Sequence, residues 1–290
     1  MKKLILPLLT SIIFTGCTSN PISPEIRQQL NQTQAEIQKN PVSILINPCL
    51  LTNELGKDLV LVEAAQLSSD KFLQTFIQQL KAQGIQVQQS ATPFICGAMP
   101  EEQIKKYDIQ MQTNSARQTI QTYPLFNTQT TNLSPEQQQA ILALNQFTTQ
   151  MDSFLLTQAY NKKANLLKPE LNDQTVNILK DWAKSSYIFV ITIDGLDASV
   201  SSKLAMGTLS LGVTLATMGA GAGIVTAYMP KEGQSYGIRL LDLNKRDFVW
   251  SKGSILKGKI FSTKHHSLEA NNILDPLFEL NKHTTETDTK

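Results

Sequence analysis

The feature that most constrains the fold is a strand, a helix and a strand in direct succession near the start of the chain. Residues 42–46 are a short run of mostly branched apolar side chains between two prolines, which predicts a strand. Residues 68–83 predict a helix, because apolar side chains recur at spacings of three and four and Gly84 follows as a stop signal. Residues 85–87 predict the next strand. Strands joined in this way lie parallel in one sheet, which indicates an α/β fold.

Later segments complete a small mixed sheet. Residues 59–62 predict a second, edge-like strand, and the continuous apolar run over residues 187–193 predicts a buried central strand. Residues 236–243 and 248–251 predict the two arms of a β-hairpin, and residues 267–280 predict a closing helix. We therefore expect a sheet that opens with the strand–helix–strand unit and closes with a hairpin and a C-terminal helix.

A helical insertion is expected at about residues 99–180. Residues 101–111 predict one helix, and a loop rich in Thr, Gln and Asn follows. A longer helix is predicted over residues 135–161, since Ser134 and Pro135 form a start signal and apolar side chains then recur on one side. A further helix is predicted over residues 173–184.

The N-terminus has the pattern of a secretory signal. Lys2 and Lys3 give a positive tip, an uncharged apolar stretch covers residues 4–14, and small residues precede Cys17. The apolar stretch is too short to remain as a membrane-spanning helix, which needs about 20 residues. Residues 1–16 are therefore expected to be removed on export.

The end of this signal resembles the bacterial lipobox, an apolar residue, a small residue, Gly or Ala, and then Cys. Residues 14–17 read Phe-Thr-Gly-Cys, and Phe14 departs from the usual Leu. The resemblance implies cleavage between Gly16 and Cys17 and lipidation of Cys17. Because Thr18 is not acidic, it also implies sorting to the outer membrane. The alternative is an ordinary signal peptide that happens to contain a cysteine.

The mature chain divides into three parts on composition. Residues 17–40 are polar and rich in Gln and Asn, so they are expected to form a flexible tether that follows the lipidated cysteine. Residues 41–280 are expected to form one periplasmic α/β domain, and residues 281–290 a disordered tail.

The formal charge of +2 includes two lysines of the signal, so the mature chain is close to neutral. Without a basic block it has no electrostatic basis for binding nucleic acid.

Two cysteines, Cys49 and Cys96, remain after lipidation of the third. An exported pair is more often joined than free, so a disulfide is predicted. Closing a loop of this length would stabilise the fold by about 4 kcal/mol on the chain-entropy model. Two buried free thiols are the alternative.

Residues 204–230 carry no charge and contain several glycines. We expect one or more helices packed on the sheet or on a partner subunit. An alternative is a membrane-inserting β-hairpin, because small or polar residues alternate there with large apolar ones, and such hairpins could build a pore from several copies. A membrane helix is the third interpretation. The residues predicted to contact a membrane or another copy in a homo-oligomer are Leu209, Leu211, Val213 and Leu215.

Several chemistries find little support in the sequence. The three histidines, His265, His266 and His283, do not form a chelating set, so no metal site is expected. Asp194 and Asp197 follow a predicted strand and are interpreted as turn residues, with a catalytic carboxylate pair as the alternative.

The glycines of residues 219–223 lack the Lys-Ser or Lys-Thr and the flanking elements of a nucleotide site. No catalytic residue and no cofactor are therefore predicted.

The order of elements and the predicted hairpin together resemble a group of outer-membrane lipoproteins with an α/β domain similar to the anticodon-binding fold. The group includes the curli secretion channel lipoprotein and the lipoprotein activators of peptidoglycan synthases. Its hairpin motif is matched by Leu240, Asp242 and Trp250, whereas Asp247 stands where the group has Gly. The resemblance covers residues 41–98 and 185–280 and leaves the insertion unexplained.

The sequence therefore predicts a non-enzymatic lipoprotein. It is expected to be held in the outer membrane by lipid, to face the periplasm and to act through contacts with an envelope protein in assembly, secretion or cell-envelope maintenance. One alternative is an oligomeric pore or secretion channel that uses residues 204–230. A second is an envelope hydrolase with Asp194 and Asp197 as its candidate residues.

Overall fold

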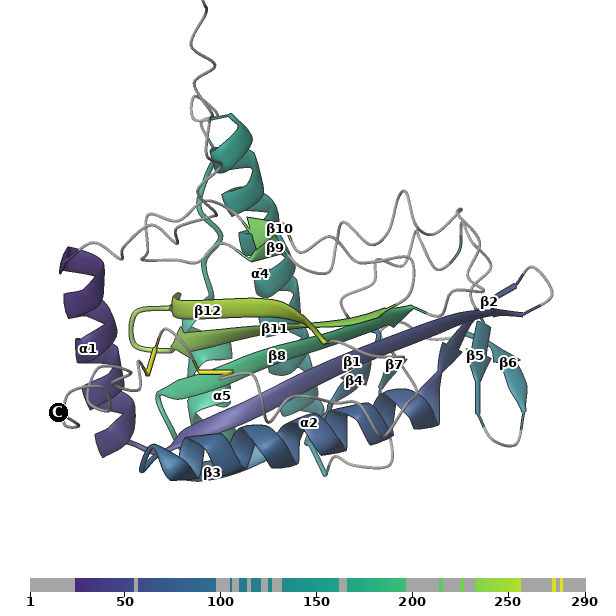
Figure 1. The fold of residues 1–290 in the computed structure, drawn as a ribbon, viewed down its shortest axis with the longest axis horizontal. Coiled ribbons are helices and arrows are strands. Elements are labelled where there is room, and N and C mark those ends of the chain that lie inside the picture. The colour runs from purple at the N-terminus through teal and green to yellow at the C-terminus, as the bar shows by residue number, and fades with distance from the viewer. Residues whose placement is uncertain are drawn as a thin grey trace, which may run out of the picture.

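The protein is a mixed α/β fold built on one sheet of eight strands (Figure 1), which confirms the predicted fold class. A computed structural model describes residues 24–54, 57–97, 105, 110–113, 116–120, 125–126, 132–161, 166–196, 214–215, 225–226, 233–256, 273–274 and 277–278. The strands of the sheet are β1 (Val42–Glu54), β2 (Lys57–Leu61), β3 (Val87–Ala91), β5 (Gln110–Gln112), β6 (Arg117–Thr119), β8 (Tyr187–Leu196), β11 (Gly233–Asp242) and β12 (Asp247–Leu256). Their order is β12-β11-β8-β1-β2-β5-β6, and β3 pairs with β1.

Strand β1 lies at the centre of this sheet and is longer than predicted. It pairs in parallel with β8 from Val42 to Leu51. On its other side it pairs with β3 up to Leu45 and with β2 from Leu51 onwards. Pro48 was expected to end the strand, but it falls in the gap between these two ladders. Its missing N–H therefore costs no ladder hydrogen bond on that side, and the strand continues to Glu54.

Helix α2 (Val62–Ala82) confirms the predicted helix of the opening unit but begins six residues earlier. Three large apolar side chains, Phe72, Phe76 and Leu80, are buried at spacings of four residues. Gly84 follows with φ of 75°, a left-handed conformation that glycine adopts without strain, and it ends the helix as expected. The next strand, β3, then pairs in parallel with β1, as the strand–helix–strand pattern predicts.

The flexible tether predicted for residues 17–40 is wrong from residue 24 onwards. Helix α1 (Pro24–Lys39) buries Leu30, Thr33 and Ile37. Ile37 is completely buried in the same apolar cluster as α2. Most residues of α1 are Gln, Asn, Glu or other polar types. A few buried side chains on one side of the helix are nevertheless enough to hold it on the core.

The insertion contains strands as well as helices. Helix α4 (Pro135–Tyr160) begins with a capping box, in which Ser134 and Gln137 exchange side-chain and backbone hydrogen bonds. It confirms the predicted long helix, and α5 (Asp173–Ala183) confirms the next one. The helix predicted over residues 101–111 is wrong at its end, because Gln110–Gln112 form β5 and pair in parallel with β2. Two further short strands, β4 (Phe94–Ile95) and β7 (Leu125–Phe126), pair with each other.

The predicted hairpin is confirmed, with longer arms. Strands β11 and β12 pair antiparallel from Gln234 opposite Leu256 to Asp242 opposite Asp247. Of the predicted closing helix, only residues 273–274 and 277–278 are described, and all four are buried in the cluster that also holds α1 and α2. The predicted tail, residues 281–290, lies outside the described residues.

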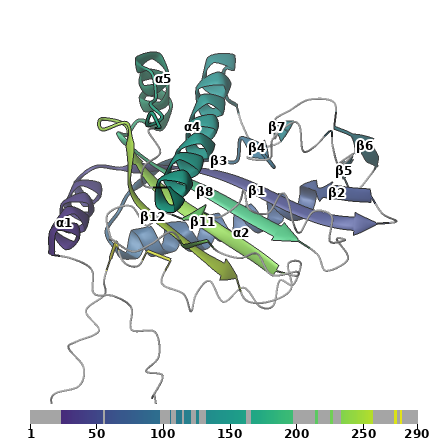
Figure 2. The ribbon, with the colours of Figure 1, turned by 90° about the horizontal axis from the view of Figure 1, so that it is seen from above.

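Helices cover both faces of the sheet, with α2 on one face and α4 and α5 on the other (Figures 1 and 2). The face under α1 and α2, called here the apolar face, carries only large apolar or aromatic side chains on its central strands. They are Val42, Ile44, Ile46, Phe189, Ile191, Ile193, Tyr236, Ile238, Leu240 and Trp250. The face under α4 and α5 holds a second cluster, which includes Leu45, Ile188, Val190 and Leu241. Beyond that cluster its side chains become polar.

Candidate functional site

A group of polar side chains gathers on the α4 side of the sheet, toward the carboxyl ends of the parallel strands β1 and β8. In parallel sheets this is the end at which ligands usually bind. The group, called here the polar patch, consists of Asn47, Cys49, Asn145, Asp152, Thr192, Asp194, Ser235 and Arg239. All but two of them come from β1, β8 and β11, and α4 supplies the remaining two.

The strand register brings the patch together. Cys49 on β1 lies beside Asp194 on β8, and Asp194 lies opposite Ser235 on β11. One row along, Asn47 lies beside Thr192. Side chains two residues apart on a strand share one face, so these rows stand next to each other on the α4 side.

A buried ion pair closes one end of the patch. The guanidinium of Arg239 donates from Nε to Oδ1 of Asp152 at 3.2 Å and from Nη2 to Oδ2 at 2.6 Å. Arg239 is 3% exposed and the Asp152 side chain 17%. Burial raises the pKa of Asp152 above its ordinary value, and the charge and hydrogen bonds of Arg239 oppose that shift. The pair anchors the C-terminal half of α4 to the middle of β11.

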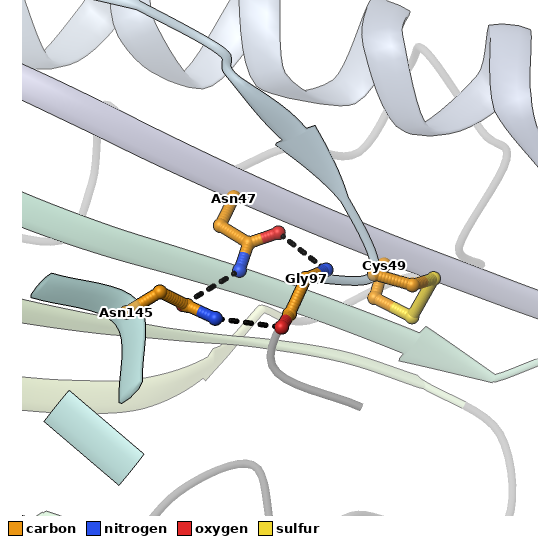
Figure 3. Close-up of a disulfide and its surroundings, with 5 residues drawn as sticks. Asn47, Cys49, Gly97 and Asn145 are labelled. Carbon is orange, nitrogen blue, oxygen red and sulfur yellow. Dashed lines mark hydrogen bonds between the residues drawn. A yellow bond between two sulfur atoms is a disulfide. The ribbon is translucent and has the colours of Figure 1, made fainter. Parts of the chain in front are cut away.

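Asparagine side chains join α4, β1 and the segment after β4 near the other end of the patch (Figure 3). Asn47 accepts a hydrogen bond from the Gly97 amide at 3.0 Å and donates to Asn145 at 3.4 Å. Asn145 in turn donates to the Gly97 carbonyl at 2.6 Å. A Cβ at Gly97 would lie 2.7 Å from Cβ of Phe94, so only glycine fits without a shift of that residue.

The predicted disulfide is confirmed. Cys49 and Cys96 are bonded across 47 residues of sequence, with their Cα atoms 4.4 Å apart (Figure 3). The Cys96 amide also donates to the Pro48 carbonyl at 2.9 Å. The bond therefore fixes the chain after β4 beside β1, next to the position of Asp194.

Asp194 does not lie in a turn, and that prediction is wrong. It is part of β8, and its Oδ2 atom is buried without a hydrogen-bond partner among the described residues. Burial raises its pKa to about 7, while the charge of Arg239 acts to lower it. Its companion in the alternative of a catalytic carboxylate pair, Asp197, lies outside the described residues, so that alternative stays untested.

Three further patch atoms are buried and have no hydrogen-bond partner in the described part of the chain. They are Oγ1 of Thr192, Oγ of Ser235 and Nη1 of Arg239. Sequence reasoning did not single out any of these residues. Arg239 carried a usable signal, because it is a charge between two apolar residues, Ile238 and Leu240, in the middle of a hairpin arm. Thr192 and Ser235 carried none, since hydroxyl residues are common in strands.

Other predicted site residues fall mostly outside the described part of the chain. These are Gly16, Cys17, Leu209, Leu211 and Val213. Leu215 is described in its backbone only. It belongs to β9 (Thr214–Leu215), which pairs antiparallel with β10 (Val225–Thr226). The helix expected in residues 204–230 is therefore wrong at these four positions.

The described residues contain no group of three or more His, Cys, Asp or Glu side chains placed to hold a metal ion. Among them, too, no helix has the length and hydropathy that a bilayer crossing requires.

No family model matches the sequence, and comparisons with curated proteins and with solved structures found no significant similarity. The resemblance to outer-membrane lipoproteins thus rests on the residues of the sequence alone.

Proposed function

We propose that this chain is an exported lipoprotein of the bacterial outer membrane that acts, without catalysis, through contacts with another envelope protein. The observation that carries the proposal is the bond between Cys49 and Cys96. Disulfides form and persist in oxidising compartments, so the bond supports export, which the pattern of residues 1–16 also indicates. The remaining cysteine, Cys17, is the one placed for lipidation.

A lipid at Cys17 would keep the domain close to the membrane. Helix α1 begins at Pro24 and packs on the core, so only six residues separate it from the cysteine. Seven steps of extended chain reach at most about 25 Å. Any partner of the domain would therefore lie near the membrane surface or be bound to it.

An exposed apolar pair that follows a projecting helix in the sequence supports a role in protein contacts. Helix α4 extends well beyond the sheet (Figure 1), and the described chain resumes a few residues after its end with Leu166 and Leu167. These leucines are 43% and 94% exposed. Burying one leucine against a partner contributes roughly 2 kcal/mol. We expect this pair to take part in the interface.

The anchor is tested by mass spectrometry of the mature protein from membranes. We expect an N-terminal Cys17 that carries acyl chains and a product that lacks residues 1–16. An unmodified N-terminus, or a retained signal, would overturn the proposal.

The contact is tested by crosslinking in intact cells, followed by purification of the native lipoprotein. Leu167→Glu should reduce the yield of the crosslinked partner at least several-fold, because a charge would be buried in the interface. Leu67→Glu is the matched control, since Leu67 is 51% exposed and lies on α2, outside the proposed interface. Equal yields from both variants would exclude Leu167 from the interface.

A second candidate function is an oligomeric channel built from residues 204–230. The pairing of β9 with β10 favours it over a helical packing segment, because a membrane hairpin needs antiparallel strands. The two candidates differ in detergent dependence. A Cys17→Ala chain that is monomeric without detergent argues for the first, whereas a ring that is stable only in detergent argues for the channel.

A further inference from the structure

Three oxygen atoms of the polar patch are placed around one point of the sheet. Asp194 and Ser235 face each other across the β8–β11 pair, and Thr192 stands two residues before Asp194 on the same face. Paired Cα atoms lie roughly 5 Å apart, so the three side chains are neighbours. Oδ2 of Asp194 and the hydroxyl oxygens of Thr192 and Ser235 are all buried, and no described residue forms a hydrogen bond with them.

Buried polar atoms without partners are rare in folded proteins, and a cluster of them calls for an occupant. Each hydroxyl or carboxylate left unpaired in the interior destabilises the folded chain. The next row of the sheet carries glycines, with Gly237 opposite Thr192 on β8 and opposite Gly253 on β12. No side chain rises from the sheet at those two positions. Glycine inside a strand often marks the close approach of a ligand.

The charge of the patch favours a cation. Arg239 and Asp152 neutralise each other through their two hydrogen bonds. Asp194 has no such hydrogen-bonded partner: its neighbours in the strand register are Cys49 and Ser235, and Arg239, whose charge also acts on it, is already bonded to Asp152. When ionised, Asp194 gives the patch one net negative charge. Arg239, Asp152 and Asp194 are the charged groups among the described residues of the polar patch.

We propose that the polar patch is a binding site for a primary ammonium group, whose three N–H bonds go to Asp194, Thr192 and Ser235. An ammonium has three donors and one positive charge, which matches three acceptor oxygens and one carboxylate. Nη1 of Arg239 remains as a donor toward a hydroxyl or carbonyl oxygen of the same molecule. The ammonium belongs either to a small free amine or to a lysine side chain of a protein partner. The inference does not depend on the lipid anchor.

The ligand should compete with protons for Asp194. Because burial raises the pKa of this carboxyl to about 7, the empty site is partly protonated at neutral pH. An ammonium binds the ionised form, so its affinity should rise with pH and level off above 7. Below that value it should fall roughly tenfold for each pH unit. A bound anion would show the opposite trend.

The test is calorimetric titration of the full-length protein with three probes at pH 6 and pH 8. Ethanolamine represents a small free amine, Nα-acetyl-lysine amide represents a lysine side chain, and tetramethylammonium has the charge without N–H donors. Binding of ethanolamine alone identifies a small amine, and binding of the lysine analogue alone identifies a partner lysine. Binding of both supports the ammonium site itself. Binding of neither amine, or equally tight binding of tetramethylammonium, overturns the proposal.

Variants connect the binding to the patch. Asp194→Asn should reduce the affinity for the amine at least 30-fold. Ser235→Ala or Thr192→Val should reduce it about tenfold, the change expected for loss of one hydrogen bond. Asp181→Asn is the matched control, because this carboxyl is 75% exposed on α5, and it should leave binding unchanged. Circular dichroism confirms that each variant is folded. Unchanged affinity in both Asp194→Asn and Ser235→Ala would place the amine elsewhere and reject the site.

Discussion

The two faces of the sheet are built from the same strands but follow different rules. On the apolar face, Phe189, Ile191 and Ile193 of β8 pack with aromatic neighbours, such as Trp250, whose ring meets that of Phe189 edge to face. On the other face, Thr192 and Asp194 of the same strand bury polar atoms that no described residue satisfies. The apolar face therefore stabilises the fold, whereas the unpaired atoms of the polar patch lower its stability. The apolar face also buries Nε1 of Trp250 without a described partner, but on the other face several such atoms gather, from Thr192, Asp194, Ser235 and Arg239. We therefore expect that face to be the one used for binding.

The largest expected effect comes from breaking the buried ion pair of the polar face. Arg239→Met keeps the apolar stem but leaves the carboxylate of Asp152 buried without its partner. We expect the free energy of unfolding to fall by about 3–5 kcal/mol at pH 7.5, because an uncompensated buried charge is strongly destabilising. Urea unfolding followed by circular dichroism measures the change.

A double variant separates the cost of an unpaired charge from the loss of a useful contact. Arg239→Met combined with Asp152→Leu removes both charges, and replacing a buried pair by apolar groups is often neutral or stabilising. The double variant should recover most of the lost stability. If it is as unstable as the single variant, the ion pair itself stabilises the fold, and the polar face contributes to stability as the apolar face does.

The next effect concerns pH and Asp194. Its pKa is about 7 in the folded chain, against an ordinary value of 3.8, so between pH 4 and pH 7 the unfolded chain gives up this proton first. Ionisation then favours unfolding, and the free energy of unfolding falls as pH rises through this window. Asp194→Asn removes the penalty. The variant should match the wild type near pH 4 and exceed its stability by about 2–4 kcal/mol at pH 8.

Urea unfolding at pH 4.5, 6 and 8 gives the difference in unfolding free energy between Asp194→Asn and the wild type. The contributions of other titrating groups are the same in both chains and cancel in this difference. Asp181→Asn, on the surface of α5, should show no such trend. A difference between Asp194→Asn and the wild type that stays constant over the whole range would mean that Asp194 is ionised when buried. The patch would then already hold a compensating positive group.

A polar atom placed on the apolar face should have a smaller but clear cost. Ile191→Thr introduces a hydroxyl at a position that is completely buried among apolar side chains. We expect a loss of about 2–3 kcal/mol, from the removed ethyl group and the unsatisfied hydroxyl together. Thermal and urea unfolding check it. A loss below about 0.5 kcal/mol would show that the apolar face accepts polar groups, and the comparison would fail.

Elements with a strong apolar pattern could be predicted from the sequence, and weakly patterned ones could not. The run over β8, the arms of the β11–β12 hairpin and the capped start of α4 each carry a local signal that the structure follows. Helix α1 was missed as a packed element, because three buried side chains among many polar ones resemble a tether. Strand β5 was missed because its pairing with β2 is set by a distant segment and not by its own sequence.

The polar patch depends even more on long-range register. The disulfide could be expected from the number of cysteines and the signal of export, since two thiols remained. The meeting of Asp194 with Ser235 could not, because it requires β8 and β11 to be adjacent, antiparallel and aligned at that residue. A shift of one residue would send Ser235 to the opposite face. Local pattern therefore predicts which segments form strands, whereas the site arises from how they align.

The smallest expected change in stability, that of Thr192→Val, is the most informative about the polar face. Valine has the shape of threonine and removes a buried hydroxyl without a partner among the described residues. The free energy of unfolding should stay unchanged or rise by up to about 1 kcal/mol, the reverse of Ile191→Thr one position earlier. Amine binding should weaken in the same variant. A variant that is more stable yet binds less would show that the unpaired oxygen is retained for its ligand, whereas lost stability would mean that solvent already satisfies it.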